Sequence, residues 1–418
     1  MDTERPLDKR GRQAARRNMF VLLSTTLLMV GTRFLWYRLL PLYLRRLGAT
    51  ETQVGTVFTV VLLLGPLQLF GGYISDRWGR RYAIAIPSLL LVPALFVGAL
   101  AEHWTWLAVM TWWVAVVSSI QQPGFQALLA ESATDEERGR VFGLFYMILA
   151  LAQMAGPAVG AVLLPVLAVS GLIGLNTIGA LISGSARLLF LREGQFATSL
   201  SAPIPTNTTS LLGKRSIQRL IVINSLFLLL LSLTRDGPFM ALHAADSLGL
   251  DEQAINVLFA IGGVGAVIAA LLGGGLSDRF GGRQVGAIAL IAHAGLLVLW
   301  GGLGWTNWAG YVLFGLSWVA VQIGIVGYSA WLSVCAPAAI RGRVLGLVGA
   351  TASLVSATGP QIGTWLRSHT LLLLNGTGWT TRLQSSTPFM LALLTALILA
   401  VLILKPLEDK VPLASPPA

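Results

Sequence analysis

Two arginines stand inside long apolar stretches of this chain, where charged side chains are rare. Arg33 lies near the middle of one stretch, and Arg235, followed directly by Asp236, lies at the corresponding depth of another. A guanidinium group binds a carboxylate or phosphate through two parallel hydrogen bonds, so such a pair suits the anionic group of a ligand. In the alternative interpretation, Asp236 neutralises one arginine while the other packs on a loop or extends to water.

Aromatic and amide side chains accompany these charges. Trp36 and Tyr37 follow Arg33 by three and four residues, which places them on the same face of a helix. We expect this face to line a cavity. Arg38 falls off that face, and we expect its side chain to extend outward along its apolar stem, as we expect for Arg187. The further cavity candidates are the glutamines Gln122, Gln126 and Gln322.

The composition requires a membrane to accommodate this chain. Of its 418 residues, 55% are hydrophobic and only 11% are charged, too few charges to cover a soluble surface. The apolar residues come in stretches of about 20, the length that spans a bilayer. The formal net charge of +11 fits arginines and lysines on the loops of one membrane face, so we expect no nucleic-acid partner. With a single cysteine, Cys335, a cysteine metal cluster is excluded, and we predict no metal or cofactor.

The apolar stretches predict an all-α integral membrane protein with twelve transmembrane helices in two pseudo-symmetric six-helix bundles. Basic residues concentrate on the N-terminal tail and on alternate loops, which places both termini in the cytoplasm of a multi-pass protein of the plasma membrane. The predicted domains are a tail at 1–17, an N-terminal bundle at 18–191, a linker at 192–216, a C-terminal bundle at 217–405 and a tail at 406–418.

A polar, glycine-rich turn occurs twice between apolar stretches. We call Gly71–Arg81 the first hinge and Gly273–Arg283 the second hinge. Each places Ser-Asp-Arg at the boundary of an apolar stretch, where glycines let helices approach and arginines hold the turn at one membrane face. The second hinge is degenerate, because Gly282 stands where the first hinge has Arg80.

Other motifs repeat at nearly the same spacing. Arg138-Gly139-Arg140 recurs at residues 341–343, and the Gly-Pro pair at 156–157 recurs at 359–360. Such repeats indicate two parallel bundles related by an axis along the membrane normal, with a binding site between them. The helix-packing candidates are Gly143, Gly156, Pro157, Gly160, Gly359, Pro360 and Gly363.

The first hinge, from Gly72 to Arg81, resembles the signature loop of the major facilitator superfamily, G-x-x-x-D-R-x-G-R-R. The resemblance covers almost the whole chain and implies a gate, in which Asp76 faces the start of the eleventh helix and a hinge arginine pairs with Glu131. The alternative is that Asp76 and Glu131 only neutralise nearby arginines. The gating-loop candidates are Gly72, Asp76, Arg77, Gly79, Arg80, Arg81, Glu131, Arg138, Asp278, Arg279 and Arg283.

The resemblance to the drug-exporter type implies a secondary active transporter that works by alternating access and exports small organic or amphipathic compounds. Two alternatives stay open: a transporter or exchanger of organic anions that uses Arg33 and Arg235, and a lipid translocator of the same fold. Protons are a candidate coupling ion, although Thr111 stands where the family's proton-coupled drug exporters carry an arginine. We expect a monomer without enzyme activity, since the chain has no HExxH motif and no intramembrane carboxylate pair.

Overall fold

The computed structural model describes residues 9–132, 138–193, 215–335, 341–373 and 378–405. Within these ranges the chain folds as helices joined by short turns. A bilayer offers no water to backbone N–H and C=O groups, and a helix pairs those groups within one segment. Most of the predicted linker (194–214), part of the predicted N-terminal tail (1–8) and all of the predicted C-terminal tail (406–418) lie outside the described residues.

The described helices supply the twelve spans predicted from the sequence. By length and composition, nine helices in the described ranges are able to cross a membrane. One of these, Arg140–Phe190, is two spans, because the backbone turns at Ala168 with a φ of 51°. A further span is the 28-residue helix α6 (Trp104–Glu131). The last consists of α14 (Arg341–Ser356) and α15 (Thr358–Leu373), which are interrupted at residue 357.

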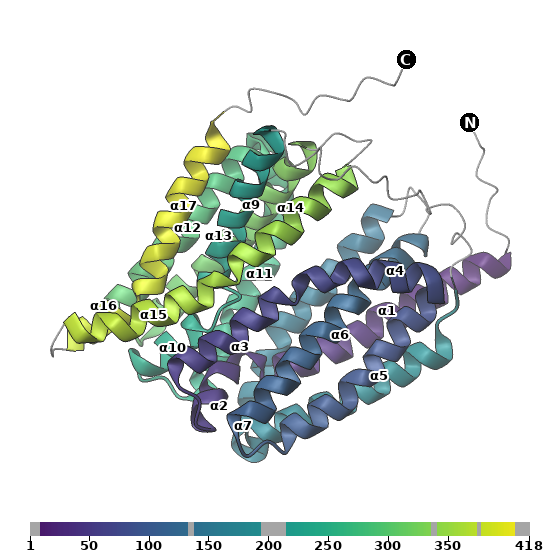
Figure 1. Ribbon diagram of the computed structural model, residues 1–418, viewed down its shortest axis with the longest axis horizontal. Helices are drawn as coiled ribbons and strands as arrows, with labels where there is room; N and C mark the ends of the chain where they lie inside the picture. The colour runs from purple at the N-terminus through teal and green to yellow at the C-terminus, as the bar shows by residue number, and fades with distance from the viewer. Residues whose placement is uncertain (1–8, 133–137, 194–214, 336–340, 374–377, 406–418) are drawn as a thin grey trace. The chain divides into compact units, whose positions relative to one another are not determined.

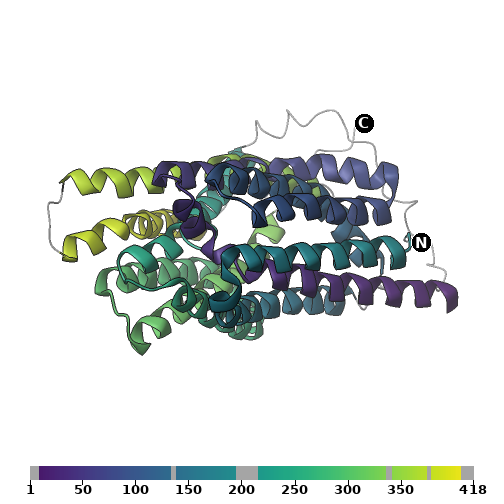
Figure 2. The same ribbon diagram turned by 90° about the horizontal axis from the view of Figure 1, so that it is seen from below.

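The helices group into two compact units. Unit 1 comprises residues 1–37 and 64–204, and unit 2 comprises residues 38–63 and 205–418. Unit 1 contains α1 (Lys9–Phe34), the 3-10 helix η2 (Gly65–Leu67), α4 (Gln68–Trp78), α5 (Arg80–Ala99), α6 and α7 (Arg138–Phe190). Within it, α1 packs along α7, and α5 packs against both α6 and α7. In Figure 2 the purple α1 runs alongside the second part of α7.

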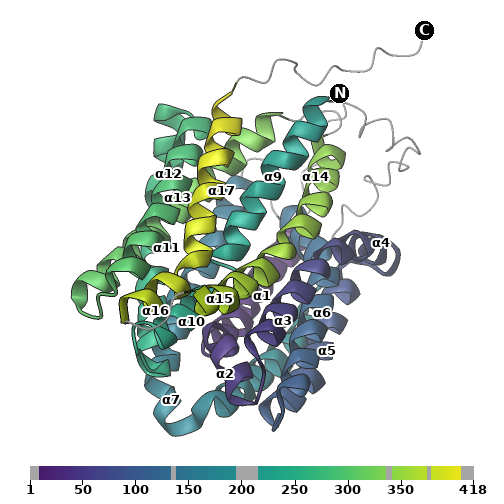
Figure 3. The same ribbon diagram turned by 60° about the vertical axis from the view of Figure 1, so that its left-hand side comes forward.

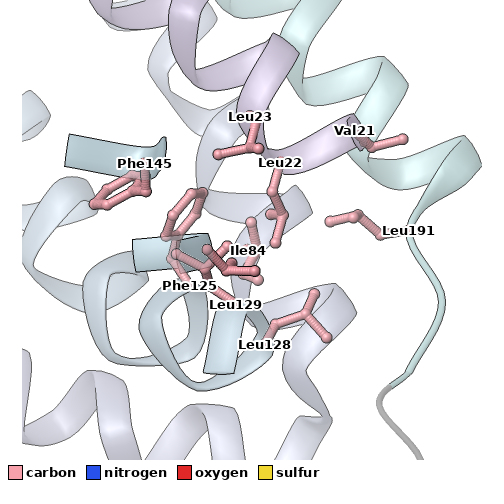
Figure 4. Packing of buried hydrophobic residues seen from close by; sticks show 10 residues of the cluster. Val21, Leu22, Leu23, Ile84, Phe125, Leu128, Leu129, Phe145 and Leu191 are labelled. Atoms are coloured by element: carbon pink, nitrogen blue, oxygen red, sulfur yellow. The ribbon is translucent and has the colours of Figure 1, made fainter. Parts of the chain in front are cut away.

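Apolar side chains from four helices form the core of unit 1. Figure 4 shows Leu22 of α1 beside Ile84 of α5 and Phe125 and Leu129 of α6. The ring of Phe125 also packs on that of Phe145 in α7, with centroids 5.3 Å apart. Lipid tails are as apolar as leucine, so close packing rather than transfer from water stabilises this core.

Unit 2 contains the second repeat and a short piece of the first. Its helices are α2 (Leu40–Arg46), α3 (Glu51–Leu63), α9 (Arg215–Leu233), α10 (Phe239–Asp246), α11 (Glu252–Phe280), α12 (Gly282–Leu303), α13 (Trp308–Cys335), α14, α15, α16 (Gly378–Ser385) and α17 (Thr387–Leu404). α13 packs against α11 and α12, and α12 packs against α17 (Figure 1). α3 lies beside α15 (Figure 3).

Each repeat begins with a broken helix. α1 ends at Phe34 and the 3-10 helix η1 (Tyr37–Leu39) separates it from α2, while residues 234–238 separate α9 from α10. Non-helical backbone at membrane depth exists only where protein or a water-filled cavity serves its polar groups. The two breaks are therefore the first places to look for a functional site.

Glycines of α7 and α15 let these helices pack closely on α1 and α9, the helices that precede the two breaks. Gly156 of α7 faces α1, and a Cβ at that position would lie 2.6 Å from Cβ of Phe34. Gly359 of α15 faces α9 in the same way, because a Cβ there would overlap the hydroxyl of Ser232. Gly363 packs on the ring of Phe239, whereas no atom lies within 4 Å of a Cβ built at Gly143.

Candidate functional site

The break between α9 and α10 carries Arg235 and Asp236. Arg235 donates a hydrogen bond from Nη1 to Oε1 of Gln322 at 3.4 Å, and its Cζ lies 5.9 Å from the ring centre of Trp318. Its Nε lies 3.7 Å from Oδ1 of Asp236 and has no hydrogen-bond acceptor in the described part of the chain. Since the Asp236 side chain is 47% exposed, solvent weakens this ion pair.

Arg38, from the break after α1, joins the same cluster. It donates from Nη1 to the backbone carbonyl of Arg235 at 3.0 Å. Its guanidinium carbon lies 5.0 Å from the ring centres of both Phe259 and Trp318. The expectation that Arg38 extends outward is therefore wrong, because two ring faces and an unwound carbonyl hold it within unit 2. We call Arg38, Arg235, Asp236, Phe259, Trp318 and Gln322 the break cluster.

Arg33, Trp36 and Tyr37 belong to unit 1. Arg33 lies in the last turn of α1 with its Cζ 4.4 Å from the ring centre of Tyr37. Among the described residues, no carboxylate forms an ion pair with it. Trp36 is buried, and its Nε1 donates to Oδ1 of Asn176 in α7 at 3.3 Å. Trp36 therefore also anchors the break to α7.

The glutamines of α6 face different surroundings. Gln122 and Gln126 are exposed and lie one turn apart on one helix face. Gln121 is buried, and its Nε2 donates to the carbonyl of Ile84 at 2.7 Å and to Oγ of Ser88 at 2.6 Å. Gln121 thus holds α6 to α5, which leaves the two exposed glutamines as the binding candidates of this helix.

Arg187 is buried, contrary to the prediction that it extends to water. Its side chain donates from Nε to Thr25 Oγ1 at 2.9 Å, from Nη1 to Ser88 Oγ at 2.9 Å and from Nη2 to Thr26 Oγ1 at 3.2 Å. Hydroxyls from two other helices therefore replace solvent around the guanidinium. The signal in the sequence is weak, because these hydroxyls are far from Arg187 along the chain.

Arg80 is the centre of a charged hub in the first hinge. Its Nη1 lies 2.5 Å from Oδ1 of Asp76, and its Nε donates to Oε1 of Glu131 at 3.1 Å. Nη1 also donates to Oγ of Ser75 at 2.8 Å. The side chains of Arg80 and Glu131 are 11% and 10% exposed, so water screens their attraction little. The hub ties α4, α5 and α6 together at one end of unit 1.

Glu193, just after α7, completes this hinge and is absent from the sequence-based candidates. Its carboxylate accepts hydrogen bonds from the backbone N–H groups of Arg80 at 2.8 Å and Arg81 at 3.0 Å. A carboxylate at a helix N-terminus satisfies unpaired donors and complements the helix dipole. Only the fold brings the end of α7 to the start of α5, so sequence spacing gives no sign of this cap.

The remaining hinge candidates take lesser parts. Arg77 donates to the hydroxyl of Tyr73 at 2.9 Å, and Arg279 lies over the ring of Phe280. At Gly72 a Cβ would meet no atom within 4 Å, while Gly71 packs against the backbone of Ile120 in α6. Arg138 begins α7, and its side chain lies outside the described part of the structure.

Among the residues that the structure describes, the second hinge forms no charged hub. Arg283 donates to the carbonyl of Ile403 at 2.6 Å and to that of Leu404, at the end of α17. Asp278 is exposed and forms no ion pair with the residues that the structure describes. Burial raises the pKa of the Cys335 thiol, near this end of unit 2, to about 11. A neutral thiol therefore stands close to the position where unit 1 has Glu131.

A model of the Major Facilitator Superfamily matches residues 21–237 and 225–418. The chain belongs to the Major Facilitator Superfamily. It is 34% identical over 101 residues to a Na(+), Li(+), K(+)/H(+) antiporter of Planococcus maritimus, across 23% of this chain and 24% of that protein. It is 24% identical over 148 residues to the quinolone resistance protein NorA of Staphylococcus aureus, across 34% of this chain and 37% of NorA. The chain thus spans only about a quarter to a third of the length of these curated relatives.

The solved structure of the nucleoside transporter NupG shares the fold of this superfamily member. It is 14% identical, the alignment covers 92% of this chain and 98% of NupG, and the TM-score is 0.71. At this identity the likeness concerns the fold alone. Together with the family, it supports a multi-pass membrane protein with the fold of a transporter.

Proposed function

We propose that this superfamily member is a secondary active transporter that exports small organic or amphipathic compounds by alternating access. It would reside in the plasma membrane with both termini in the cytoplasm, as the distribution of basic residues predicts. The match to NorA, a quinolone resistance protein, supports export of organic compounds by this chain.

The break cluster is the observation that carries the proposal. Charged side chains inside a membrane bundle mark substrate or ion pathways, since each costs about 2.5–3.5 kcal/mol to insert. Here Arg38 and Arg235 lie over the faces of Phe259 and Trp318, beside unwound backbone. Aromatic faces bind the apolar body of a small compound, while guanidinium and amide groups bind its polar end.

Organic anions are the second candidate substrate class. The sequence predicts that Arg33 and Arg235 bind the anionic group. Two guanidinium groups, those of Arg38 and Arg235, lie over the ring of Trp318, while one carboxylate, that of Asp236, lies beside Arg235. This excess of positive charge favours an anionic group. Arg33, which belongs to unit 1, stays the other predicted anion-binding arginine, because its guanidinium lies over the ring of Tyr37 and pairs with no carboxylate of the described residues.

Protons are the proposed coupling ion, and Asp236 is the proposed carboxylate. Its carboxylate is 47% exposed, so water reaches it, and it lies 3.7 Å from Nε of Arg235 in the break between α9 and α10. The likeness to a protein named as a cation/H(+) antiporter supports this assignment. An Asp236→Asn variant should bind substrate but lose the pH dependence of its transport.

Transport into liposomes tests the proposal. Purified protein is reconstituted and assayed against a panel of organic anions, cations and neutral compounds, with and without a proton gradient. Arg235→Ala should weaken the binding of a transported anion by the worth of a charged hydrogen bond, about 1.5–3 kcal/mol, or roughly ten- to a hundredfold. Arg235→Lys should also weaken the binding of this anion, because lysine lacks the planar guanidinium group that donates two parallel hydrogen bonds.

Arg279→Ala is the matched control. The contact that the described structure shows for the Arg279 guanidinium is with the ring of Phe280, so this variant should bind the anion as the parent protein does. If Arg33→Ala and Arg235→Ala both transport every compound at the rate of the parent protein, the arginines are structural. The substrates would then be neutral or cationic compounds. Failure of every compound to be transported would contradict the proposed function itself.

A further inference from the structure

Basic side chains lie at one end of the apolar core of unit 1. Val21 of α1, Ile84 of α5 and Leu191, which follows α7, belong to this core (Figure 4). Arg17 precedes Val21 by four residues, and Arg81 precedes Ile84 by three. Residues at these spacings share a helix face, so each arginine lies one turn beyond a core residue, toward the first hinge.

Hydrogen bonds bring a third arginine, Arg192, to the same end. Asn18 of α1 donates from Nδ2 to the backbone carbonyl of Arg192 at 2.9 Å and accepts from its backbone N–H at 2.9 Å. Nη2 of Arg81 donates to the carbonyl of Leu188, near the end of α7, at 2.6 Å. We call Arg17, Arg81 and Arg192 the basic rim, because they surround the core where α1, α5 and the end of α7 meet.

The basic rim has donors without acceptors. Nε of Arg17 and Nε of Arg81 are buried and have no hydrogen-bond partner among the described residues, and such donors carry a desolvation cost. Within the same part of the chain, no rim arginine forms an ion pair. The carboxylates of the charged hub pair with Arg80, and Glu193 accepts from backbone N–H groups of the first hinge. The rim therefore suits an anion from outside the described chain.

Further basic residues precede the rim along α1. The helix begins at Lys9 and runs without a break into the first membrane span. Lys9, Arg10, Arg12 and Arg16 lie in this part of the helix, and the sequence has no acidic residue from position 9 to position 50. A cluster of about four to eight basic residues directly beside a membrane helix attracts anionic lipid headgroups.

Exposed apolar side chains continue from the rim into the spans. Tyr82, Ile86 and Leu90 are exposed on α5 and are spaced by four residues, which places them on one helix face. Leu189 and Phe190 are exposed at the end of α7. A phospholipid matches this arrangement, because its phosphate lies at the height of the rim while its acyl chains contact the apolar side chains. A soluble phosphate would use the charges alone.

We propose that the basic rim binds the phosphate of an anionic phospholipid at the membrane face where the first hinge lies. The unpaired Nε groups of Arg17 and Arg81 donate to phosphate oxygens, and guanidinium groups match the geometry of phosphate. The positive charge of the rim selects a lipid with net negative charge over a zwitterionic lipid, whose amine offsets its phosphate. This site is separate from the break cluster and is independent of the compound that the protein transports.

Lipid binding to the purified full-length protein tests the site. The protein in neutral detergent is titrated separately with phosphatidylglycerol and with phosphatidylcholine of the same acyl chains, and native mass spectrometry measures the fraction that carries each lipid. The parent protein should bind phosphatidylglycerol at least about tenfold more tightly, since several basic residues near the membrane surface each add to the attraction. Equal affinity for the two lipids would overturn the proposal.

Arg17→Gln combined with Arg192→Gln removes two rim charges, and neither side chain has a hydrogen bond to a described residue that this change would break. The affinity for phosphatidylglycerol should fall at least about tenfold. Arg215→Gln combined with Arg279→Gln is the matched control, because it removes the same charge from exposed positions of unit 2. The control should bind as the parent does, and an equal loss in the control would overturn a specific site.

Two further comparisons separate a lipid site from its alternatives. Lysine at positions 17 and 192 keeps the charge and should keep the preference for phosphatidylglycerol, whereas loss of the preference would contradict a role of charge. Phosphatidylglycerol should raise the thermal unfolding midpoint of the parent protein, and water-soluble glycerol phosphate should not. Equal shifts would show a site for free phosphate and overturn the lipid. If the double glutamine variant does not fold, Arg192→Gln alone should weaken binding by a smaller factor, and parent affinity in that variant would overturn the proposal.

Discussion

The two hinges share one backbone design. Gly79 and Gly281 precede α5 and α12 with φ angles of 87° and 83°, which side chains other than glycine rarely adopt. Arg81 donates to the carbonyl of Leu188 near the end of α7, and Arg283 donates to the carbonyl of Ile403 near the end of α17. In each unit an arginine thus satisfies carbonyls that a helix C-terminus leaves unpaired.

The hinges differ in the charged hub. Arg80 links Asp76 and Glu131 in unit 1. Its counterpart in unit 2 is Gly282, where a Cβ would lie 2.7 Å from the carbonyl oxygen of Gly327 in α13. Close helix packing therefore leaves no room for an arginine there. The comparison separates two roles. The glycine turn and the arginine that caps a helix end join helices in both units, whereas the ion pairs of the hub join helices in unit 1.

Removal of Arg80 should have the largest effect. Arg80→Gln leaves Glu131, which is 10% exposed, without its cation among the described residues, and loss of one partner of a buried pair costs about 3–5 kcal/mol. Thermal unfolding in detergent and transport rate should both fall. The contacts of Arg283 with described residues are hydrogen bonds to carbonyls, so Arg283→Gln should cost less. An Arg283→Gln variant that is less stable than Arg80→Gln would contradict the division of roles.

Gly282→Ala should destabilise unit 2, because the added methyl group meets the backbone of α13. Overpacking of this kind typically costs about 1–3 kcal/mol. The measurement is the midpoint of thermal unfolding, with Gly274→Ala as the control, since a Cβ at Gly274 meets no atom within 4 Å. Equal stability of the two variants would remove the steric explanation for the missing arginine.

Alanine at the two turn glycines should differ in effect. Both substitutions place a side chain at positive φ, which costs of order 1–3 kcal/mol. Gly79→Ala also brings Cβ to 2.5 Å from Oε1 of Glu193 and disturbs the cap of α5, while Gly281→Ala meets no atom within 4 Å. Gly79→Ala should therefore have the lower unfolding midpoint. The reverse order would show that the Glu193 cap contributes little.

The hinge aspartates test the hub without a change in size. Asp76→Asn weakens the contact with Arg80 and should slow transport while membrane insertion stays normal. Asp278→Asn should leave transport unchanged, because Asp278 has no ion pair within the described part of unit 2. If a well-expressed Asp76→Asn variant transports at the parent rate, Asp76 is a surface charge without a role in transport.

Cys335 gives the smallest and most local test. Burial raises the pKa of its thiol to about 11, so the thiol stays neutral at pH 7 and alkylation should accelerate only as the pH approaches that value. The rate of iodoacetamide labelling is measured against pH, and the unfolded protein, with an ordinary thiol pKa of about 8.5, is the reference. A midpoint near the ordinary value in folded protein would mean that an anion is tolerated at this end of α13.

Local sequence patterns were sufficient to predict the backbone turn of both hinges and the membrane spans. Glycine before a polar turn predicts the break between helices, and long apolar stretches predict the spans that the described residues form. The same patterns gave no sign of Glu193, because a cap depends on which helix end lies nearby. They also led to the wrong prediction that the side chains of Arg38 and Arg187 extend outward. The position of a residue in an apolar stretch does not reveal whether hydroxyls or aromatic rings replace water around its side chain.

Hydropathy and motif spacing are properties of the chain alone, so they suffice to predict the membrane environment, the twelve spans and the twofold repeat. Which charges meet depends on the folded arrangement of the helices. Arg367 and Glu51 are 316 residues apart and still form an ion pair. Such a contact depends on the rotation of each helix to within a fraction of a turn, and that rotation is set by the packing of many side chains at once.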